Sequence, residues 1–277
     1  MGAAHKGITM PDKPKITLGT IEVTTPKTQV TRMSMVIWGP SGCGKTTIAA
    51  TAPRPILWIN FDPDGTSSLM DQEDIHIADF SMENPNKVVT FKHENAGGIK
   101  QVLDDHPDIK TVVFDSITSF NEMALKHAVS EVRGASMELP TLQGYGRRNS
   151  YTMQGIMSVI RTTGALNKHC IFIAHEDAPS KDEMTGAMTV SILVGGKMQS
   201  EIPIKLSEVW HMEDTGKERK ITIRANRMKK PMKSRMFKQD GDTDFIWKFS
   251  PEEWKGEGIA DWYTRWVDND GKKINLP

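Results

Sequence analysis

The chain has 277 residues, of which 38% are hydrophobic and 25% are charged, and its Lys and Arg residues balance its Asp and Glu residues. This composition predicts a globular protein with one large α/β domain and excludes a membrane protein, because no run approaches the ~18 apolar residues of a spanning helix. We expect no secretory signal, since the first residues include no apolar run. Two cysteines argue against a disulfide framework and predict a cytoplasmic protein.

Residues 1–30 are polar and rich in Lys and Pro, with one alternating stretch, KITLGTIEVTT. They predict an N-terminal arm with a candidate oligomerisation strand. The residues that follow alternate between apolar runs and amphipathic segments, which predicts a mostly parallel sheet flanked by helices. Strands are predicted at 32–38, 54–61, 109–115 and 168–175, and helices at about 45–52, from about 96 with Asn95 as N-cap, at 118–132 and at 147–166.

The remaining residues predict loops, a hairpin and a last helix. Residues 133–146 and 176–198 have loop-like composition, and a turn at 214–216 separates two hairpin strands. Ser250, Pro251 and Glu253 form a capping-box pattern that predicts a helix, with Trp254, Trp262 and Trp266 packed on the core. We therefore divide the chain into an arm (1–30), an α/β core (31–250) and a C-terminal helix and tail (251–277).

The stretch GPSGCGKTT at 39–47 lies between a predicted strand and a predicted helix, which is the context of a phosphate-binding loop. Its glycines let backbone N–H groups face phosphate oxygens, and the helix start adds partial positive charge. Lys45 is expected to reach the β- and γ-phosphates, Thr46 to ligate Mg²⁺ and Thr47 to donate to the α-phosphate. The predicted cofactors are ATP and Mg²⁺, and the predicted nucleotide-binding residues are Gly39, Pro40, Ser41, Gly42, Cys43, Gly44, Lys45, Thr46 and Thr47.

Other candidate site residues stand at the ends of predicted strands, where parallel sheets bind ligands. Asp115 ends TVVFD, where a Walker B Asp would hold Mg²⁺ through water; its alternative role is to cap the next helix. Asp62 is the candidate base that orients water, with Asp64 in reserve and a turn-forming role as the alternative. His175 ends CIFIAH and either senses the γ-phosphate or serves a structural role.

The chain resembles the RecA-like recombinase core over residues 32–250, and more closely the small phage-encoded RecA-core proteins of the Sak type, which anneal single strands. GPSGCGKTT, FDPDG, VVFDSITSF and IFIAH follow one another in the family's order. The resemblance implies that Asp62 stands where the family usually carries a catalytic Glu, and His175 where RecA itself has Gln. Because Asp is one methylene shorter than Glu, we expect slow hydrolysis.

The resemblance also implies two DNA-binding loops, at 131–150 and 176–199, with Arg133, Arg147, Arg148 and Lys197 as candidate phosphate contacts. The alternative for Arg147 and Arg148 is a solvated helix start. The first loop has no aromatic platform beyond Tyr145 for stacking bases.

Residues 217–238 hold ten Lys or Arg against one acid, Glu218, so they form either an anion-binding face or a solvated run of charge. Within them, RANRMKKP is similar to the family's basic segment that reaches the ATP of a neighbouring subunit. The resemblance implies that Arg227 is the cation acting in trans, and Arg224, Lys229 and Lys230 are the alternatives.

These observations predict an ATP-binding and ATP-hydrolysing protein that forms a filament or ring on single-stranded DNA and promotes annealing or recombination. Family analogy adds a single-strand-binding protein as a partner and, for a phage-encoded chain, the host bacterial cytoplasm as the location. Two alternatives remain open: a P-loop kinase acting on a small molecule, and an annealing protein in which ATP is a structural ligand only. The chain has no obvious lid helix with several Arg, which argues against the kinase.

Overall fold

The computed structural model describes residues 16–22, 32–88, 98–181, 186–226, 228–229, 232–239, 241 and 243–277. The chain divides into two compact units, residues 1–31 and residues 32–277. In the first unit, β1 (Thr17–Leu18) pairs antiparallel with β2 (Ile21–Glu22). A role of this short hairpin in oligomerisation stays a prediction.

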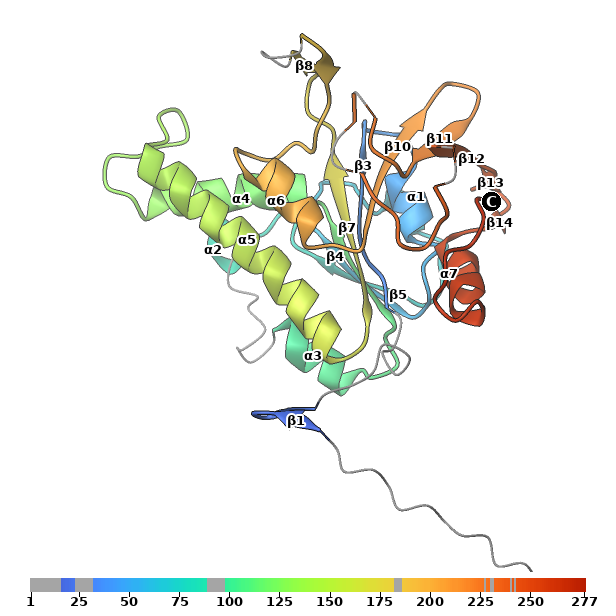
Figure 1. The fold of residues 1–277 in the computed structure, drawn as a ribbon. Coiled ribbons are helices and arrows are strands. Elements are labelled where there is room, and N and C mark those ends of the chain that lie inside the picture. Colours follow the sequence, from blue (N-terminus) through green and yellow to red (C-terminus); the bar gives the residue numbers. More distant parts are fainter. Residues whose placement is uncertain are drawn as a thin grey trace, which may run out of the picture. The chain divides into compact units, whose positions relative to one another are not determined.

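The second unit is built on an eight-stranded sheet with the strand order β12-β11-β10-β3-β7-β6-β4-β5 (Figure 1). Six neighbouring strands, from β10 to β5, run parallel, and β11 and β12 extend the sheet antiparallel. The strands are β3 (Ser34–Gly39), β4 (Ile56–Asn60), β5 (Ile75–Asp79), β6 (Thr111–Asp115), β7 (His169–His175), β10 (Glu208–Asp214), β11 (Arg219–Thr222) and β12 (Asp244–Trp247). The predicted α/β class with a mostly parallel sheet is confirmed.

Helices cover both faces of this sheet, as the βαβ rhythm of the sequence requires. On one face lie α3 (Ile99–Asp105), α4 (Ile117–Ser130), α5 (Leu142–Ala165) and α6 (Met198–Ile204); on the other lie α1 (Lys45–Ala49) and α7 (Ile259–Asp268). The remaining short elements are η2 (Ser67–Leu69), α2 (Pro85–Val88), β8 (Ser180–Lys181), β9 (Met188–Thr189), β13 (Phe249–Ser250) and β14 (Lys255–Gly256).

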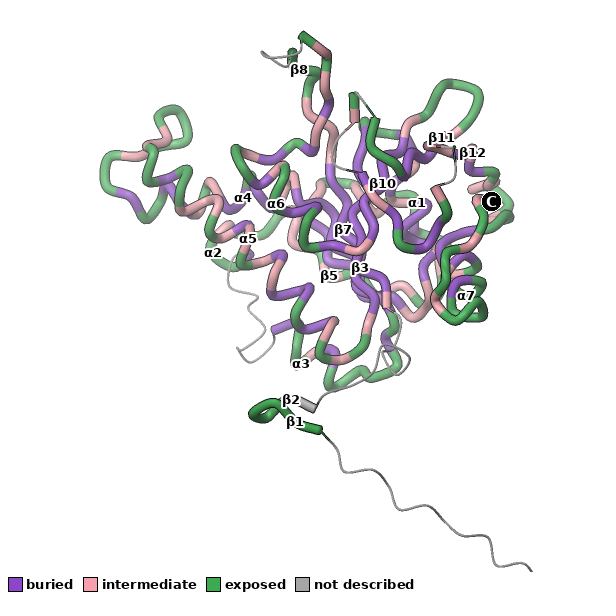
Figure 2. Tube along the Cα trace, in the orientation of Figure 1, coloured by how far each residue is buried: buried purple, intermediate pink, exposed green. Residues whose placement is uncertain are grey.

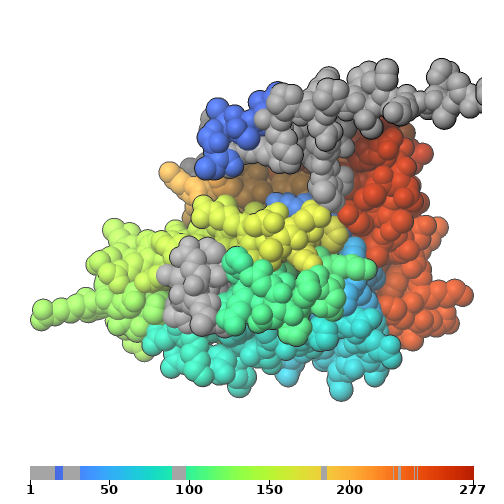
Figure 3. Space-filling model, turned by 90° about the horizontal axis from the view of Figure 1, so that it is seen from below, coloured from blue at the N-terminus to red at the C-terminus, as the bar shows by residue number. Residues whose placement is uncertain are grey.

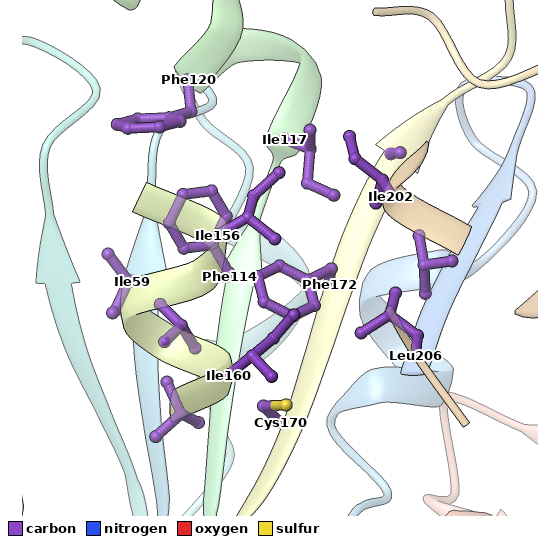
Figure 4. Close-up of a cluster of buried hydrophobic side chains, with 14 of the residues drawn as sticks. Ile59, Phe114, Ile117, Phe120, Ile156, Ile160, Cys170, Phe172, Ile202 and Leu206 are labelled. Carbon is purple, nitrogen blue, oxygen red and sulfur yellow. The ribbon is translucent and has the colours of Figure 1, made fainter. Parts of the chain in front are cut away.

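Alternating side chains of the central strands build the two halves of the core, because successive residues of a strand face opposite sides. Phe114 of β6 and Phe172 of β7 pack against Ile156 and Ile160 of α5, as Figure 4 shows. Val113, their neighbour on β6, faces the opposite core. The strands are therefore buried on both sides (Figure 2), and each fully buried Ile or Phe contributes about 1.5–3 kcal/mol through removal of apolar surface from water.

Several predicted elements occur with shifted limits. The helix predicted at 147–166 begins earlier, at Leu142, because the Thr141 hydroxyl caps it by accepting the Gly144 N–H at 3.2 Å. The predicted hairpin is confirmed as β10 and β11. The predicted cap Asn95 lies outside the described residues. Although α5 is long, no helix in the described parts of the chain combines the length and apolar character needed to cross a membrane.

The helix predicted to open at Ser250 is wrong. Glu253 N does donate to Ser250 Oγ, at 3.4 Å, but residues 251–254 form only a turn, because Ser250 pairs with Lys255 between β13 and β14. The helix instead begins at Ile259, whose N–H donates to Thr51 Oγ1 at 2.9 Å. Trp262 and Trp266 pack on the core from this helix as predicted, and Trp254 also packs against the core but lies outside the helix.

Among the elements that the sequence did not predict, β5 and α6 pack on the central sheet. Strand β5 extends the sheet beyond β4, and α6 begins after the Gly195-Gly196 pair, at Met198, the last residue of the segment that composition marked as loop. Helix α6 contains Pro203, a residue type that is unfavourable in helix interiors. The helix is held by burial of Met198 and Ile202 against the core.

Candidate functional site

The carboxyl ends of the parallel strands surround a cavity of about 530 Å³. It is lined by the phosphate-binding loop, by the segment after β4, and by the ends of β6 and β7; its residues are Ser41, Gly42, Gly44, Lys45, Thr46, Thr47, Asp62, Pro63, Asp64, Gly65, Ser67, Ser68, Asp115, Ile173, His175 and Arg219. The structure thus brings together the nucleotide loop and every strand-end residue that the sequence singled out.

The loop between β3 and α1 has the conformation that a phosphate-binding loop requires. Gly42 and Gly44 have φ angles of 76° and 99°, a region that side-chain-bearing residues rarely adopt. Gly44 immediately precedes α1, so the first N–H groups of that helix have no partner within the helix. The loop is therefore suited to anionic oxygens.

Lys45 is held against this loop. Its side chain is only 5% exposed, and its Nζ donates to Gly39 O at 3.0 Å and Pro40 O at 2.5 Å. A buried ammonium needs such partners, because burial without them would cost several kcal/mol. The ammonium lies at the cavity wall, where phosphate oxygens can replace the carbonyl groups.

Thr46 and Asp115 form a pair of oxygen donors suited to Mg²⁺. Thr46 Oγ1 donates to Asp115 Oδ2 at 3.4 Å. Burial, reinforced by the charge of Asp62, raises the pKa of the Asp115 carboxyl to about 7. Among the described residues no group of three His, Cys, Asp or Glu gathers that could hold a metal alone. A hard cation fits this hydroxyl and carboxylate, with phosphate oxygens and water completing its ligands.

Asp62 is fixed by three donors. Ser116 Oγ donates to its Oδ1 at 3.0 Å, Ser119 Oγ also donates to Oδ1, and His175 Nε2 lies 3.3 Å from Oδ2. Burial raises the pKa of Asp62, but the hydrogen bonds from His175 and Ser119 outweigh it, so the pKa lies below its ordinary value. Asp62 is thus an ionised acceptor in a defined orientation. Asp64 lines the same cavity from the exposed turn that follows.

The two serines that hold Asp62 were not predicted as site residues. Both lie at the start of α4: Ser119 is in its first turn, and Ser116 is the N-cap, which accepts the Ser119 N–H at 3.2 Å. A Ser three residues after an N-cap Ser lies on the same side of the first turn, which is the sequence signal that could have found the pair.

Strand register places His175 next to the loop. In the parallel pairing of β3 with β7, His175 is the partner of Gly39. The His175 N–H donates to Thr118 Oγ1 at 3.0 Å, and this bond ties the strand end to the start of α4. The predicted sensor position is therefore in contact with both Asp62 and the elements around the cavity.

The two predicted DNA loops lie next to each other. A Cβ on Gly195 would overlap the guanidinium of Arg148, so the second loop passes directly over the first residues of α5. Arg148 also donates to Asn149 Oδ1 and stacks over Tyr145 at 5.0 Å. Arg147 is ion-paired with Glu131 at 2.9 Å.

The other two predicted DNA contacts, Arg133 and Lys197, are exposed. Arg133 lies in the connection from α4 to α5, which projects from the rest of this unit in Figures 1 and 3. Arg227, the predicted cation acting in trans, and its alternative Lys230 lie outside the described residues. The alternative Lys229 is ion-paired with Glu213 at 2.8 Å, and Arg224 donates to Gln239 O.

Comparison with known proteins gives a family match that covers this site. A search of curated proteins finds no match. A solved structure titled "Crystal structure of the RadB recombinase" is similar over 79% of this chain and 88% of that one, with 12% sequence identity and a TM-score of 0.47, a likeness too distant to assign activity. A family model described as an AAA domain, AAA_24, matches residues 31–238, which include the loop and all the strands that form the cavity. With three quarters of its length in that match, the chain belongs to the AAA_24 family of AAA domains.

Proposed function

We propose that this protein binds and hydrolyses ATP, oligomerises on single-stranded DNA, and promotes annealing or homologous recombination. The observation that carries the nucleotide part is the cavity itself, in which the loop, the Thr46–Asp115 pair and the Asp62–His175 pair face one space. Membership of the AAA_24 family supports the same activity.

Each residue has a chemical task in this proposal. The backbone of the loop and Lys45 hold the triphosphate, and Thr46 with Asp115 positions the divalent ion. Mg²⁺, when bound, neutralises charge on the phosphate oxygens. Asp62 accepts a hydrogen bond from the attacking water and orients it, because its ionised carboxylate is held by Ser116, Ser119 and His175.

A low pKa makes Asp62 a better orienting acceptor than a proton acceptor. The weaker a base is, the smaller the driving force for taking the proton of water. Slow turnover is therefore expected, in agreement with the short reach of Asp compared with Glu.

The proximity of the two loops supports the DNA part of the proposal. Arg148 contacts Gly195 across the loops, and the exposed Arg133 and Lys197 flank this contact along the chain. Repeated along an oligomer, such cations could neutralise successive backbone phosphates. Arg227 acts on the neighbouring subunit's ATP in this proposal, so that ATP favours assembly.

The remaining expectations belong to the same proposal. A single-strand-binding protein is the proposed partner, and the bacterial cytoplasm, in a phage-infected host, is the proposed location. The proposed organisation is an arm at 1–30, an ATPase core at 31–250 and a C-terminal helix and tail at 251–277.

The decisive experiment measures ATP hydrolysis and oligonucleotide binding in the wild type and in Lys45→Ala. We expect poly-dT to stimulate ATP hydrolysis. We also expect the protein to raise the fluorescence anisotropy of a labelled oligonucleotide on binding it. Lys45→Ala should weaken ATP binding by about 100-fold or more, because a charge-assisted contact to phosphate is lost from a buried position.

Three other outcomes would contradict the proposal. Phosphate transfer to a nucleoside or metabolite, without DNA binding at low salt, would indicate a kinase. DNA binding without turnover would indicate that ATP is a structural ligand. Unchanged ATP affinity in Lys45→Ala would remove the nucleotide site itself.

A further inference from the structure

Arg219 is a cation of the cavity that neither the loop motif nor the basic-segment alignment identifies. It is the first residue of β11, opposite Asp214 of β10 and Trp247 of β12. Because β10 runs parallel to β3, the turn between β10 and β11 lies at the same edge of the sheet as the phosphate-binding loop. Strand order, rather than sequence proximity, therefore brings Arg219 to the loop.

The side chain of Arg219 lies directly against the loop. A Cβ built on Gly44 would lie 3.3 Å from both Cδ and Nε of Arg219, and Arg219 lines the cavity together with Lys45 and Thr46. The loop itself is pressed onto β10, since a Cβ on Gly39 would overlap the carbonyl oxygen of Met212. The distance between loop and arginine is thus set by sheet packing.

The guanidinium of Arg219 has an aromatic support and no acidic partner within the described parts of the chain. Its Cζ lies 5.9 Å from the ring centre of Trp247, and the indole N–H of that ring donates to Glu257 O at 2.9 Å. Asp214, the residue opposite on β10, uses its carboxylate to accept the Gly216 N–H at 2.7 Å. No ion pair joins Arg219 to a described Asp or Glu.

We infer that Arg219 is a nucleotide-binding residue of this subunit, which contacts the phosphate groups of a bound nucleoside triphosphate. The inference rests on the proposed nucleotide function. A guanidinium presents several N–H donors in one plane and suits phosphate oxygens, and stacking on an indole ring reduces the conformational freedom lost on binding. The cavity is also lined by three carboxylates, Asp62, Asp64 and Asp115, which would repel an anionic ligand. A second cation beside Lys45 offsets part of this repulsion and so favours binding of such a ligand.

This role differs from that proposed for Arg227. Arg219 acts within one subunit, so its effect on nucleotide affinity does not require assembly. Arg227 acts between subunits, so its effect appears only in the oligomer. Affinity measured below the assembly concentration separates the two.

The test uses the full chain without DNA, at a concentration where light scattering detects no assembly. A fluorescent ATP analogue is titrated into wild type, Arg219→Ala, Arg219→Lys and Lys248→Ala, and is then displaced with ATP, ADP or inorganic tripolyphosphate. Lys248 is exposed beside Trp247 and does not line the nucleotide cavity. Lys248→Ala is therefore the matched control, because it removes one positive charge outside the cavity.

We expect Arg219→Ala to weaken the binding of ATP and of tripolyphosphate by similar factors, about 10- to 100-fold. The affinities of Arg219→Lys should be intermediate, and those of Lys248→Ala should equal the wild-type values. Equal affinities in wild type and Arg219→Ala would overturn the inference. Weaker ATP binding with unchanged tripolyphosphate binding would also overturn it, because the contact would then be to base or sugar.

Two measurements keep this result distinct from other failures. Thermal unfolding of each variant shows whether it is folded, and Arg219→Lys carries the test if Arg219→Ala is not. If the wild type binds the analogue and Lys45→Ala does not, the proposed nucleotide site stands whatever Arg219 does. If the wild type does not bind it, the proposed function itself fails.

Discussion

Two carboxylates of the site have pKa values that their surroundings move in opposite directions. Asp115 is 2% exposed, and burial followed by repulsion from Asp62 raises its pKa to about 7. Asp62 is also mostly buried, yet hydrogen bonds from His175 and Ser119 lower its pKa. Environments that separate two acids in this way are typical of sites in which each acid has its own task.

A buried histidine away from the site gives the protein a defined pH dependence of stability. His169 is 7% exposed, and its Nδ1 accepts the Met33 N–H at 3.1 Å. Burial, followed by the charges of Arg32 and Lys110, lowers its pKa from 6.5 to about 4. Between these two values the unfolded chain binds more protons than the folded one, so stability increases with pH.

We predict that His169→Gln reduces this pH dependence. The contribution of His169 is fully present above pH 6.5 and is lost as the pH falls toward 4, by about 3 kcal/mol in total. Urea unfolding at several pH values between 4 and 7 measures it, with the exposed His76→Gln as control. Parallel pH profiles for wild type and His169→Gln would contradict the assignment.

At the scale of elements, the packing of α5 on α4 positions the residues that hold Asp62. Gly155 of α5 lies against Phe120 of α4, and a Cβ there would be 2.6 and 2.7 Å from two ring carbons. Phe120 has little room to move, because its ring lies 5.1 Å from each of the rings of Phe61 and Phe114. The small residue in α5 is therefore required by the close approach of the two helices.

We predict that Gly155→Ala destabilises the protein by about 1–3 kcal/mol through overpacking, despite the better helix propensity of Ala. Gly146→Ala is the matched control, because it lies in the same helix and a Cβ there meets nothing within 4 Å. That control should stabilise by up to about 1 kcal/mol. Denaturant unfolding of both variants tests the pair, and equal changes would rule out the steric explanation.

At the scale of the whole molecule, one topological feature gathers the site. β3, β7, β6 and β4 are parallel neighbours, so their carboxyl ends meet at one edge and bring Gly39, His175, Asp115 and Asp62 together. Such an edge is where open α/β sheets bind ligands. The antiparallel β11 adds Arg219 to the same edge.

Assembly through Arg227 is the prediction that belongs to this scale. Arg227→Ala should lower DNA-stimulated ATP hydrolysis and ATP-dependent assembly together, while the monomer stays folded and binds ATP. A loss of about 10³-fold in turnover is the scale for removing an arginine supplied by a neighbouring subunit. Light scattering and hydrolysis measured on the same samples test this, with the exposed Arg161→Ala as control. Normal assembly of Arg227→Ala would refute the role in trans.

Local patterns were sufficient for much of this protein. The nucleotide loop is a continuous segment whose glycines and following helix can be recognised from the sequence, and the buried strands can be recognised as apolar runs. The same runs placed Asp62, Asp115 and His175 at strand ends. The helix expected at Ser250 was wrong because strand pairing of Ser250 with Lys255 prevailed over a local capping pattern, and β5 and α6 were missed because neither has a strong pattern of its own.

Contacts between distant segments decided the rest. Hydroxyls of α4 hold Asp62, the second loop passes over Arg148, and Arg219 reaches Gly44 across the sheet. Only the two serines leave a signal in the chain, through their spacing at the start of α4. The other two contacts leave none, because they depend on which strands become neighbours and how closely loops and helices approach. The amino-acid order thus specifies a phosphate-binding loop in an α/β protein, whereas the packing of the sheet and its helices determines which carboxylate is oriented and which arginine faces the cavity.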